Sequence, residues 1–512
     1  MSAALPVEVL AAPPSQPLAP AKYVPCAPIL APSSPLVIRR WSLLIASLSA
    51  VFFLLSFSIH IPVWDVLSVY ALFAFSIVLL MLSPYTRSNP LHPLSLIIFF
   101  GLLNYGIRAL EIIYLHSPVQ NLVNPEHYIA KACFLTIVSF VLLFLGFHLK
   151  YAGSLARQVP LFAFPVPKSR LNGVLFRAFL FFLLTVYANY HEISLGVSHF
   201  YTSRAVLHSG LDSVFHEIAS YINVTFLAFL PLFFLRKFPR YLIPGMMAIM
   251  MLIAAVSGSS TNLVMPLALL AIVFWLCRKP LAWPKFLQIW LFLILALAPL
   301  VYAWRYVYYA QVQAGGSSAS AALSSFDSAA VVGGYSQSVN NVLARFGRLD
   351  MLLLVLKMVP SRYPFQFGNT FMPYLVQIFM PRILYAHKKI VDVGTEFRYL
   401  FQGLRGTSNI SLGFVGETFF NFGYFGMALA FPVGMLIRFF WDRLLAYSRI
   451  EPMWAWRLYF VVFLACLGYD STLIYYFATL LRGPLVLYLI MMFVFLRLPK
   501  RVSWKWFEAL ST

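Results

Sequence analysis

The chain has 512 residues, of which 61% are hydrophobic and 10% are charged, and its formal net charge is +21. Soluble domains carry about 25% charged residues, so this composition excludes an ordinary soluble globular protein. Repeated apolar runs of about 20 residues instead predict an all-α, polytopic integral membrane protein. In such a protein, basic cytoplasmic loops explain the positive charge more simply than nucleic-acid binding, and no nucleic-acid partner is expected. The scattered cysteines contain no C-x-x-C pair, so neither a metal site nor a disulfide framework is predicted.

The first segment, 1–38, is rich in proline and almost free of charge, which predicts a disordered cytoplasmic tail. About twelve membrane spans follow, nine within 39–304 and three within 411–498. They lie near 41–61, 63–83, 93–115, 131–149, 173–193, 216–235, 240–257, 261–277, 286–304, 411–438, 456–476 and 480–498.

Lysine and arginine are distributed among the loops as this count requires. With the N-terminus inside, the expected cytoplasmic connections are basic, whereas the expected outer connections 116–130 and 477–479 hold no lysine or arginine. The N-terminus and the tail 499–512 are therefore both predicted to be cytoplasmic. The basic residues on that side include Arg87, Lys150, Arg157, Arg236, Lys237, Arg278, Lys279, Arg443, Arg449, Lys500 and Arg501.

One outer segment breaks this rule. Residues 305–410 form a large loop that is expected outside the membrane and yet is strongly basic. Long loops escape the charge bias, so an ordinary soluble loop is one interpretation. We favour an anion-binding site on the outer face, because the planar guanidinium of arginine makes bidentate bonds to pyrophosphate. Within this loop the apolar run Met351–Leu356 is too short to span, and it is expected along the interface or between helices.

Ionisable residues inside membrane spans are costly, so each is a candidate functional residue. Here they lie mainly in the outer halves of the spans, whereas a proton-coupled transporter would hold them near the midplane. The candidates of this kind are Arg108, Glu111, His191, Glu192, His216, Glu217, Glu417, Asp470 and Arg482. Structural alternatives stay open: an i, i+3 ion pair of Arg108 with Glu111, a salt bridge of Asp470 with Arg482, and packing of Glu417 at a helix–loop junction.

Several motifs that would indicate other chemistry are absent. The sequence has no G-x-x-x-x-G-K-[ST], no H-E-x-x-H, no Asp-x-Asp and no Gly-x-Ser-x-Gly. It therefore gives no sign of an ATP-driven pump, a zinc protease or a nucleotide-sugar transferase. A site on the outer face has no nucleotide supply, so group transfer there is expected to use a pre-activated donor carried in the membrane.

Four motifs follow one another between Arg345 and Gly426. They are Arg345-Phe-Gly-Arg-Leu-Asp350, Phe367-Gly-Asn-Thr, Met380-Pro-Arg-Ile-Leu with Lys388-Lys389, and Gly416-Glu-Thr-Phe-Phe-Asn-Phe-Gly-Tyr-Phe-Gly426. In this order they resemble the oligosaccharide repeat-unit polymerases of bacterial polysaccharide assembly, the Wzy-type or O-antigen polymerase-like proteins. Outside this part, the resemblance covers only the number of spans and the large outer loop. It admits a GT-C-like arrangement of the spans.

The resemblance implies a reaction at the periplasmic face of the bacterial inner membrane. A terminal sugar hydroxyl of one lipid-linked unit attacks the anomeric carbon of the growing glycan, and undecaprenyl pyrophosphate leaves. No metal, nucleotide or other cofactor is implied. A Wzz-type chain-length co-polymerase and a flippase are the implied partners.

Site roles are carried over by the same resemblance. Arg382, Arg345 and Arg348 would bind pyrophosphate, and Glu417 would be the general base or a substrate anchor, with Asp470 as a second catalytic candidate. Many relatives have an arginine where this chain has Ser257-Gly-Ser-Ser-Thr-Asn262, so Arg305 or Arg405 is expected to substitute. The remaining substrate-binding candidates are Lys388, Arg482, Arg108 and Asn421.

Two other functions remain open on the sequence. An O-antigen ligase would use the same donor with a lipid A-core acceptor. A transporter or flippase for lipid-linked sugars would need a polar path on both sides of the membrane, and the inner halves of these spans are bare.

Overall fold

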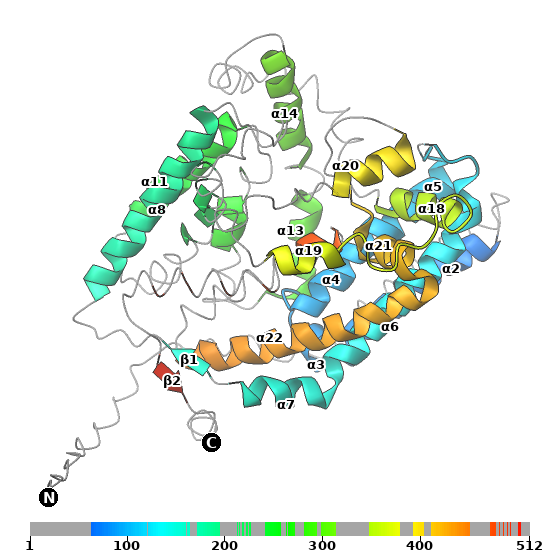
Figure 1. Cartoon of the computed structure of the whole chain (residues 1–512), viewed down its shortest axis with the longest axis horizontal. Coiled ribbons are helices and arrows are strands. Elements are labelled where there is room, and N and C mark those ends of the chain that lie inside the picture. Colours follow the sequence, from blue (N-terminus) through cyan, green and yellow to red (C-terminus); the bar gives the residue numbers. More distant parts are fainter. Residues whose placement is uncertain are drawn as a thin grey trace, which may run out of the picture.

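The computed structural model describes the helical core of the chain (Figure 1). The described segments are 63–119, 121–159, 161–163, 171–194, 241–257, 265–271, 281–293, 298–313, 348–378, 393–403, 411–450, 472–477 and 500–502, with single residues between 212 and 226, at 263 and between 481 and 492. The predicted tail 1–38, the first span near 41–61 and most of the last two spans lie outside these residues.

The described residues are almost entirely helical, which confirms the predicted fold class apart from one pair of strands, β1 (Leu161–Ala163) and β2 (Lys500–Val502), which are antiparallel. The helices are α2 (Val63–Leu82), α3 (Pro84–Ser88), α4 (Pro93–Gly101), η2 (Leu102–Ile107), α5 (Arg108–Leu115), η3 (Pro125–Tyr128), α6 (Ile129–His148), α7 (Lys150–Gln158), α8 (Leu171–Ser194), α11 (Leu242–Val256), α13 (Trp283–Phe292), α14 (Ala298–Gln313), α18 (Arg348–Met358), α19 (Met372–Ile378), α20 (Val393–Phe397), η7 (Arg398–Gln402), α21 (Gly413–Phe422), η8 (Gly423–Leu429), α22 (Ala430–Ile450) and α24 (Leu473–Phe477).

Four helical stretches are long and apolar enough to cross a membrane, and each coincides with a predicted span. They are Val63–Leu82, Pro93–Leu115, Pro125–His148 and Gly413–Leu444. Helices α8 and α11 cover two further predicted spans and lie side by side (Figure 1). Helix α14 runs beyond 304, the predicted end of the ninth span, so the predicted outer loop begins with helix.

Helices α2, α6 and α22 run in the same direction. The C-terminal ends of α2 and α6 meet where His148 Nε2 lies 3.0 Å from Ser83 Oγ, just beyond α2. The middle of α22 reaches the same end of α6, where the Arg438 guanidinium lies over the Phe147 ring. At the opposite end of α6, the Lys131 ammonium lies over the ring of Tyr424, just before α22. Two helices that cross a membrane in the same direction require an odd number of crossings between them.

The odd number agrees with the five spans predicted between α6 and α22. A sixth crossing by the apolar run of α18 would reverse α22. In the structure α18 is instead enclosed: all six residues of Met351–Leu356 are buried, and the helix packs against α6, α21 and η2. A helix that is apolar on every side is stable only when it is surrounded. Of the two predicted positions for this run, the one between helices is therefore confirmed.

Helices α6 and α22 approach each other closely because each has a glycine at the contact. A Cβ atom on Gly146 would collide with the carbonyl oxygen of Phe431, and one on Gly434 would collide with that of Leu143. Association of helices in lipid depends on close packing rather than on removal of apolar surface from water, so small residues at such contacts are favoured. The two helices lie side by side in the lower part of Figure 1.

The two ends of this bundle carry different loops. At one end, the α7 end, β1 pairs with β2, and Arg443 at the C-terminal part of α22 donates to the carbonyl oxygen of Val159. At the other, the α5 end, Arg108 binds Asp350, and Asn121 Nδ2 donates to the carbonyl oxygen of Gln402 at 2.7 Å. This grouping is the one expected from the loop charges, since the predicted cytoplasmic residues meet at the α7 end.

Candidate functional site

The predicted span 411–438 is not one straight helix. Helix α21 ends at Gly423, which has a φ of 61°, and the chain folds back so that a Cβ atom on Gly426 would collide with the carbonyl oxygen of Thr418. A break within an apolar stretch leaves carbonyl groups that lipid cannot satisfy, so other parts of the protein must bind them. The Gln366 N–H donates to the Phe420 carbonyl oxygen at 3.1 Å, and the Phe367 N–H donates to the Asn421 carbonyl oxygen at 2.9 Å.

The loop that binds this break contains the Phe367-Gly-Asn-Thr motif, so two motifs separated by about fifty residues meet directly. The Gly368 N–H donates to Asn421 Oδ1 at 2.9 Å. Asn421 Nδ2 donates to Thr370 Oγ1 and to the Glu417 carbonyl, both at 2.8 Å. Thr370 Oγ1 donates to Glu417 Oε1 at 2.8 Å, and the Leu473 N–H donates to Glu417 Oε2 at 2.7 Å. We call these five residues the Glu417 cluster.

Gly368 is required by the backbone of this loop. Its φ is 92°, and the preceding Phe367 has a φ of 49°, both in the left-handed region that side chains with a Cβ atom disfavour. This conformation turns the successive N–H groups of Phe367 and Gly368 towards the end of α21. The motif therefore provides the donors that the broken helix needs.

The Glu417 and Asn421 side chains are completely buried. The carboxamide of Asn421 is used within the protein at both Oδ1 and Nδ2, so its geometry indicates a brace for the loop rather than a direct contact with substrate. Glu417 accepts a donor at each carboxylate oxygen, which suits an ionised carboxylate and offsets the cost of burying it.

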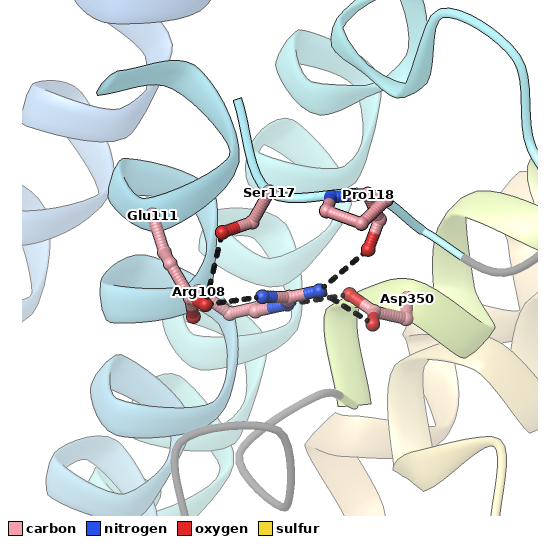
Figure 2. A network of polar contacts seen from close by, with 5 residues as sticks. All are labelled: Arg108, Glu111, Ser117, Pro118 and Asp350. Carbon is pink, nitrogen blue, oxygen red and sulfur yellow. Dashed lines mark hydrogen bonds and ion pairs between the residues drawn. The ribbon is translucent and has the colours of Figure 1, made fainter. Parts of the chain in front are cut away.

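A second set of polar contacts lies at the α5 end of the bundle, and Figure 2 shows its side chains from close by. Arg108 donates from Nε and Nη2 to the two carboxylate oxygens of Asp350, both at 2.9 Å, and lies 2.7 Å from Glu111 Oε1 through Nη1. Its Nη2 also donates to the carbonyl oxygen of Pro118 at 3.2 Å, and Ser117 Oγ donates to Glu111 Oε1 at 3.1 Å. We call these five residues the Arg108 cluster.

The Arg108 cluster includes the i, i+3 pair expected from the sequence and adds Asp350 as a bidentate partner from α18. The Arg108 guanidinium is almost fully buried, and the carboxylates of Glu111 and Asp350 use its N–H groups. An anionic substrate would have to displace them. Burial raises the pKa of the Asp350 carboxyl, and the charge and hydrogen bonds of Arg108 reduce that rise. The contacts of Arg108 therefore favour a structural role, in which it holds α5 against α18, over a role in substrate binding.

Other predicted site residues are only partly covered by the structure. Arg348 begins α18, and its Nη1 donates to the carbonyl oxygen of Ser411, just before α21, at 3.4 Å. Arg305 lies in α14, but its side chain is outside the described part. Six further candidates lie outside the described residues altogether: Arg345, Arg382, Lys388, Arg405, Asp470 and Arg482.

Two residues at this end were given no role from the sequence. Thr370 is within the Phe367-Gly-Asn-Thr motif, but nothing in that motif indicates that its hydroxyl binds the carboxylate of Glu417 in α21. The Lys131 ammonium lies 5.3 Å from the ring centroid of Phe419 and 5.1 Å from that of Tyr424. A lysine at the start of an expected span is typical of the membrane boundary. Nothing in the sequence therefore predicts that Lys131 lies beside α21.

No protein-family model, curated protein or solved structure matches this chain. Within the described part of the chain, no group of three or more His, Cys, Asp or Glu side chains is arranged to hold a metal ion.

Proposed function

We propose that this chain is a membrane glycosyltransferase that polymerises lipid-linked oligosaccharide units at the periplasmic face of the bacterial inner membrane. The growing glycan is transferred from undecaprenyl pyrophosphate to the terminal sugar hydroxyl of an incoming unit. The α5 end of the bundle faces the periplasm in this proposal, and both termini are cytoplasmic.

The observation that carries the proposal is the contact between the two motifs on which the resemblance depends most. The side chains of Thr370 and Glu417 meet in one cluster, although they come from different segments. A buried carboxylate in contact with a hydroxyl is suited to take a proton from an attacking hydroxyl. Among the candidate bases, Glu417 is the one with a described environment of this kind.

The basic segment supports the same reaction. Pyrophosphate is a good leaving group when its charge is neutralised, and arginine does this without losing its own proton. We assign this role to Arg382, Arg345 and Arg348, with Arg305, Arg405 and Lys388 as further candidates. The Arg108 cluster is outside this role because its guanidinium is bound by carboxylates.

The test uses the purified full-length chain in liposomes with a lipid-linked oligosaccharide unit, and the product is a ladder of longer glycans. We expect the wild-type chain to elongate the unit without added nucleotide. Glu417→Gln should reduce the rate by about 10²–10⁴-fold, the usual contribution of general acid–base catalysis. Glu396→Gln is the matched control, since it removes an exposed carboxylate from α20 at the same end.

Three results would contradict the proposal. Transfer of glycan only to a lipid A-core acceptor would identify a ligase, and movement of the unit across the bilayer without elongation would identify a flippase. Full activity of Glu417→Gln would remove Glu417 from the mechanism. The glutamine amide replaces one of the two accepting oxygens of Glu417 by a donor, which can also lower stability. Thermal unfolding in detergent measures that loss of stability separately from loss of the base.

A further inference from the structure

The Glu417 cluster has one member at the surface. Glu417, Asn421 and Gly368 are buried, whereas Thr370 is half-buried and Asn369 beside it is exposed. A substrate can therefore contact Thr370, whereas the Glu417 carboxylate is covered. We propose that Thr370 is a catalytic residue that relays the proton of the acceptor hydroxyl to Glu417, an assignment that rests on the proposed polymerase function.

The direction of each hydrogen bond in the cluster follows from one backbone group. The Gly368 N–H can only donate, so the Asn421 atom that faces it is the oxygen Oδ1. The other amide atom, Nδ2, must then donate to Thr370 Oγ1. Because Thr370 Oγ1 accepts that bond, its own proton points to Glu417 Oε1.

This polarity leaves Thr370 ready to take part in proton transfer. A hydroxyl has one proton and two acceptor positions. The proton is given to Glu417 and one acceptor position is used by Asn421, while no described residue donates to the second position. An acceptor sugar hydroxyl can donate there. Glu417 accepts from the Leu473 N–H at Oε2, so Oε1 is the carboxylate oxygen that faces the Thr370 hydroxyl.

The step balances without any further reactant. The acceptor hydroxyl gives its proton to Thr370 Oγ1, while Thr370 gives its own proton to Glu417 Oε1. The acceptor oxygen forms a bond to the anomeric carbon, and the bond from that carbon to pyrophosphate breaks, with the electron pair leaving on the pyrophosphate. The proton on Glu417 returns to solvent through Thr370 when the product has moved away.

The surroundings of Thr370 suit a substrate held at the membrane surface. Three aromatic side chains near it in the fold are strongly exposed: Phe367 (72%), Tyr424 (56%) and Phe425 (89%). Exposed aromatic residues are typical of the boundary between lipid and water, where the pyrophosphate of a lipid carrier lies. The proposal therefore places the Thr370 hydroxyl near the level at which the sugars of a lipid-linked unit begin.

The experiment compares Thr370→Val, which keeps the shape and removes the hydroxyl, with Thr370→Ser, which keeps the hydroxyl. In the liposome elongation reaction, we expect Thr370→Val to lower kcat by about 100-fold or more with little change in KM. Thr370→Ser should stay within about threefold of wild type. The double variant Thr370→Val/Glu417→Gln should be no slower than the slower single variant, because both changes interrupt one proton path.

Thr418→Val is the matched control. It removes a buried threonine hydroxyl one residue from Glu417, but among the described residues that hydroxyl donates to the backbone carbonyls of Phe414 and Val415 and not to the Glu417 cluster. We expect it to keep kcat within about threefold. If Thr370→Val does not fold, as judged by thermal unfolding in detergent, Thr370→Ala gives the same comparison.

The outcomes are distinguishable. A wild-type chain that elongates while Thr370→Val keeps more than a tenth of its activity overturns the relay and leaves the polymerase proposal standing. Equal losses in the Val and Ser variants also overturn it, because the loop shape and not the hydroxyl would then matter. A wild-type chain that does not elongate lipid-linked units overturns both proposals.

Discussion

The Arg108 cluster and the Glu417 cluster lie at the same end of the bundle, and both connect segments that are far apart in the sequence. They use their hydrogen-bonding capacity in opposite ways. The guanidinium of Arg108 makes all of its observed contacts to protein carboxylates and one carbonyl (Figure 2). The Glu417 cluster ends at Thr370, a half-buried residue whose hydroxyl donates to Glu417 and accepts from Asn421.

This difference in contacts separates buried charges that stabilise the fold from buried charges that can take part in a reaction. A buried ion pair is held by its own members, and removing one member leaves an uncompensated charge, so its loss is felt in stability. A buried carboxylate bound by neutral donors keeps its capacity to accept a proton, so its loss is felt in the reaction. Both clusters contain residues that sequence patterns mark as candidates. Only their contacts distinguish them.

The largest effect on stability is expected from Arg108→Met. This change leaves Asp350 and Glu111 facing each other without a cation, and it should lower the free energy of unfolding by about 3–5 kcal/mol. The activity per folded molecule should fall by less than about tenfold. Thermal unfolding in detergent, with the elongation rate normalised to folded protein, measures both quantities.

Arg362→Met is the control for this prediction. Arg362 is exposed at the same end, and its guanidinium lies over the ring of the neighbouring Tyr363. Its replacement should change the unfolding free energy by less than about 0.5 kcal/mol. If Arg108→Met is as stable as this control but inactive, Arg108 belongs to the substrate site and the contrast between the clusters fails.

The fold class and the bundle could be predicted because they depend on apolar length and loop charge. Four expected spans reappear as helices, and the apolar run Met351–Leu356 is buried between helices, one of the two positions expected for it. The break at Gly423 was missed, because a window of apolar residues does not show where backbone carbonyls find donors. Those donors come from Phe367 and its neighbours, which are distant in sequence.

The site could be predicted only as a set of residue types. Glu417 and Asn421 were expected to be functional from their motif, and they are in contact. The role of Thr370 depends on the polarity of a hydrogen-bond chain that begins at the Gly368 N–H, and composition does not encode such a chain. The partner of Arg108 was also missed, since Asp350 is 242 residues away.

A smaller effect is expected from Asn421→Asp, which tests the polarity of the Glu417 cluster. An oxygen would replace Nδ2, so the Thr370 hydroxyl and the Glu417 carbonyl would each lose a donor. We expect a loss of about 1–3 kcal/mol in the free energy of unfolding. The elongation rate should also fall by at least about tenfold, because Thr370 would be drawn to the new carboxylate and away from Glu417.

Asn369→Asp provides the comparison, since it makes the same chemical change on an exposed side chain of the same loop. It should leave both stability and elongation near wild type. Equal behaviour of the two variants would mean that added negative charge, and not the lost donor, is responsible.

The smallest effect concerns pH and returns to the Arg108 cluster. Burial raises the pKa of the Asp350 carboxyl above 3.8, the ordinary value for an aspartate. In a pH window above 3.8, Asp350 is therefore protonated in the folded chain and ionised in the unfolded chain. Within that window the free energy of unfolding falls as pH rises. Thermal unfolding in detergent should therefore show wild type gaining stability, relative to Asp350→Asn, as the pH is lowered towards 3.8. The gain should be small, because the Arg108 guanidinium favours the ionised form and opposes the effect of burial. A gain in the opposite direction would mean that the ion pair outweighs burial at Asp350, and the Arg108 cluster would then stabilise the fold more as the pH rises.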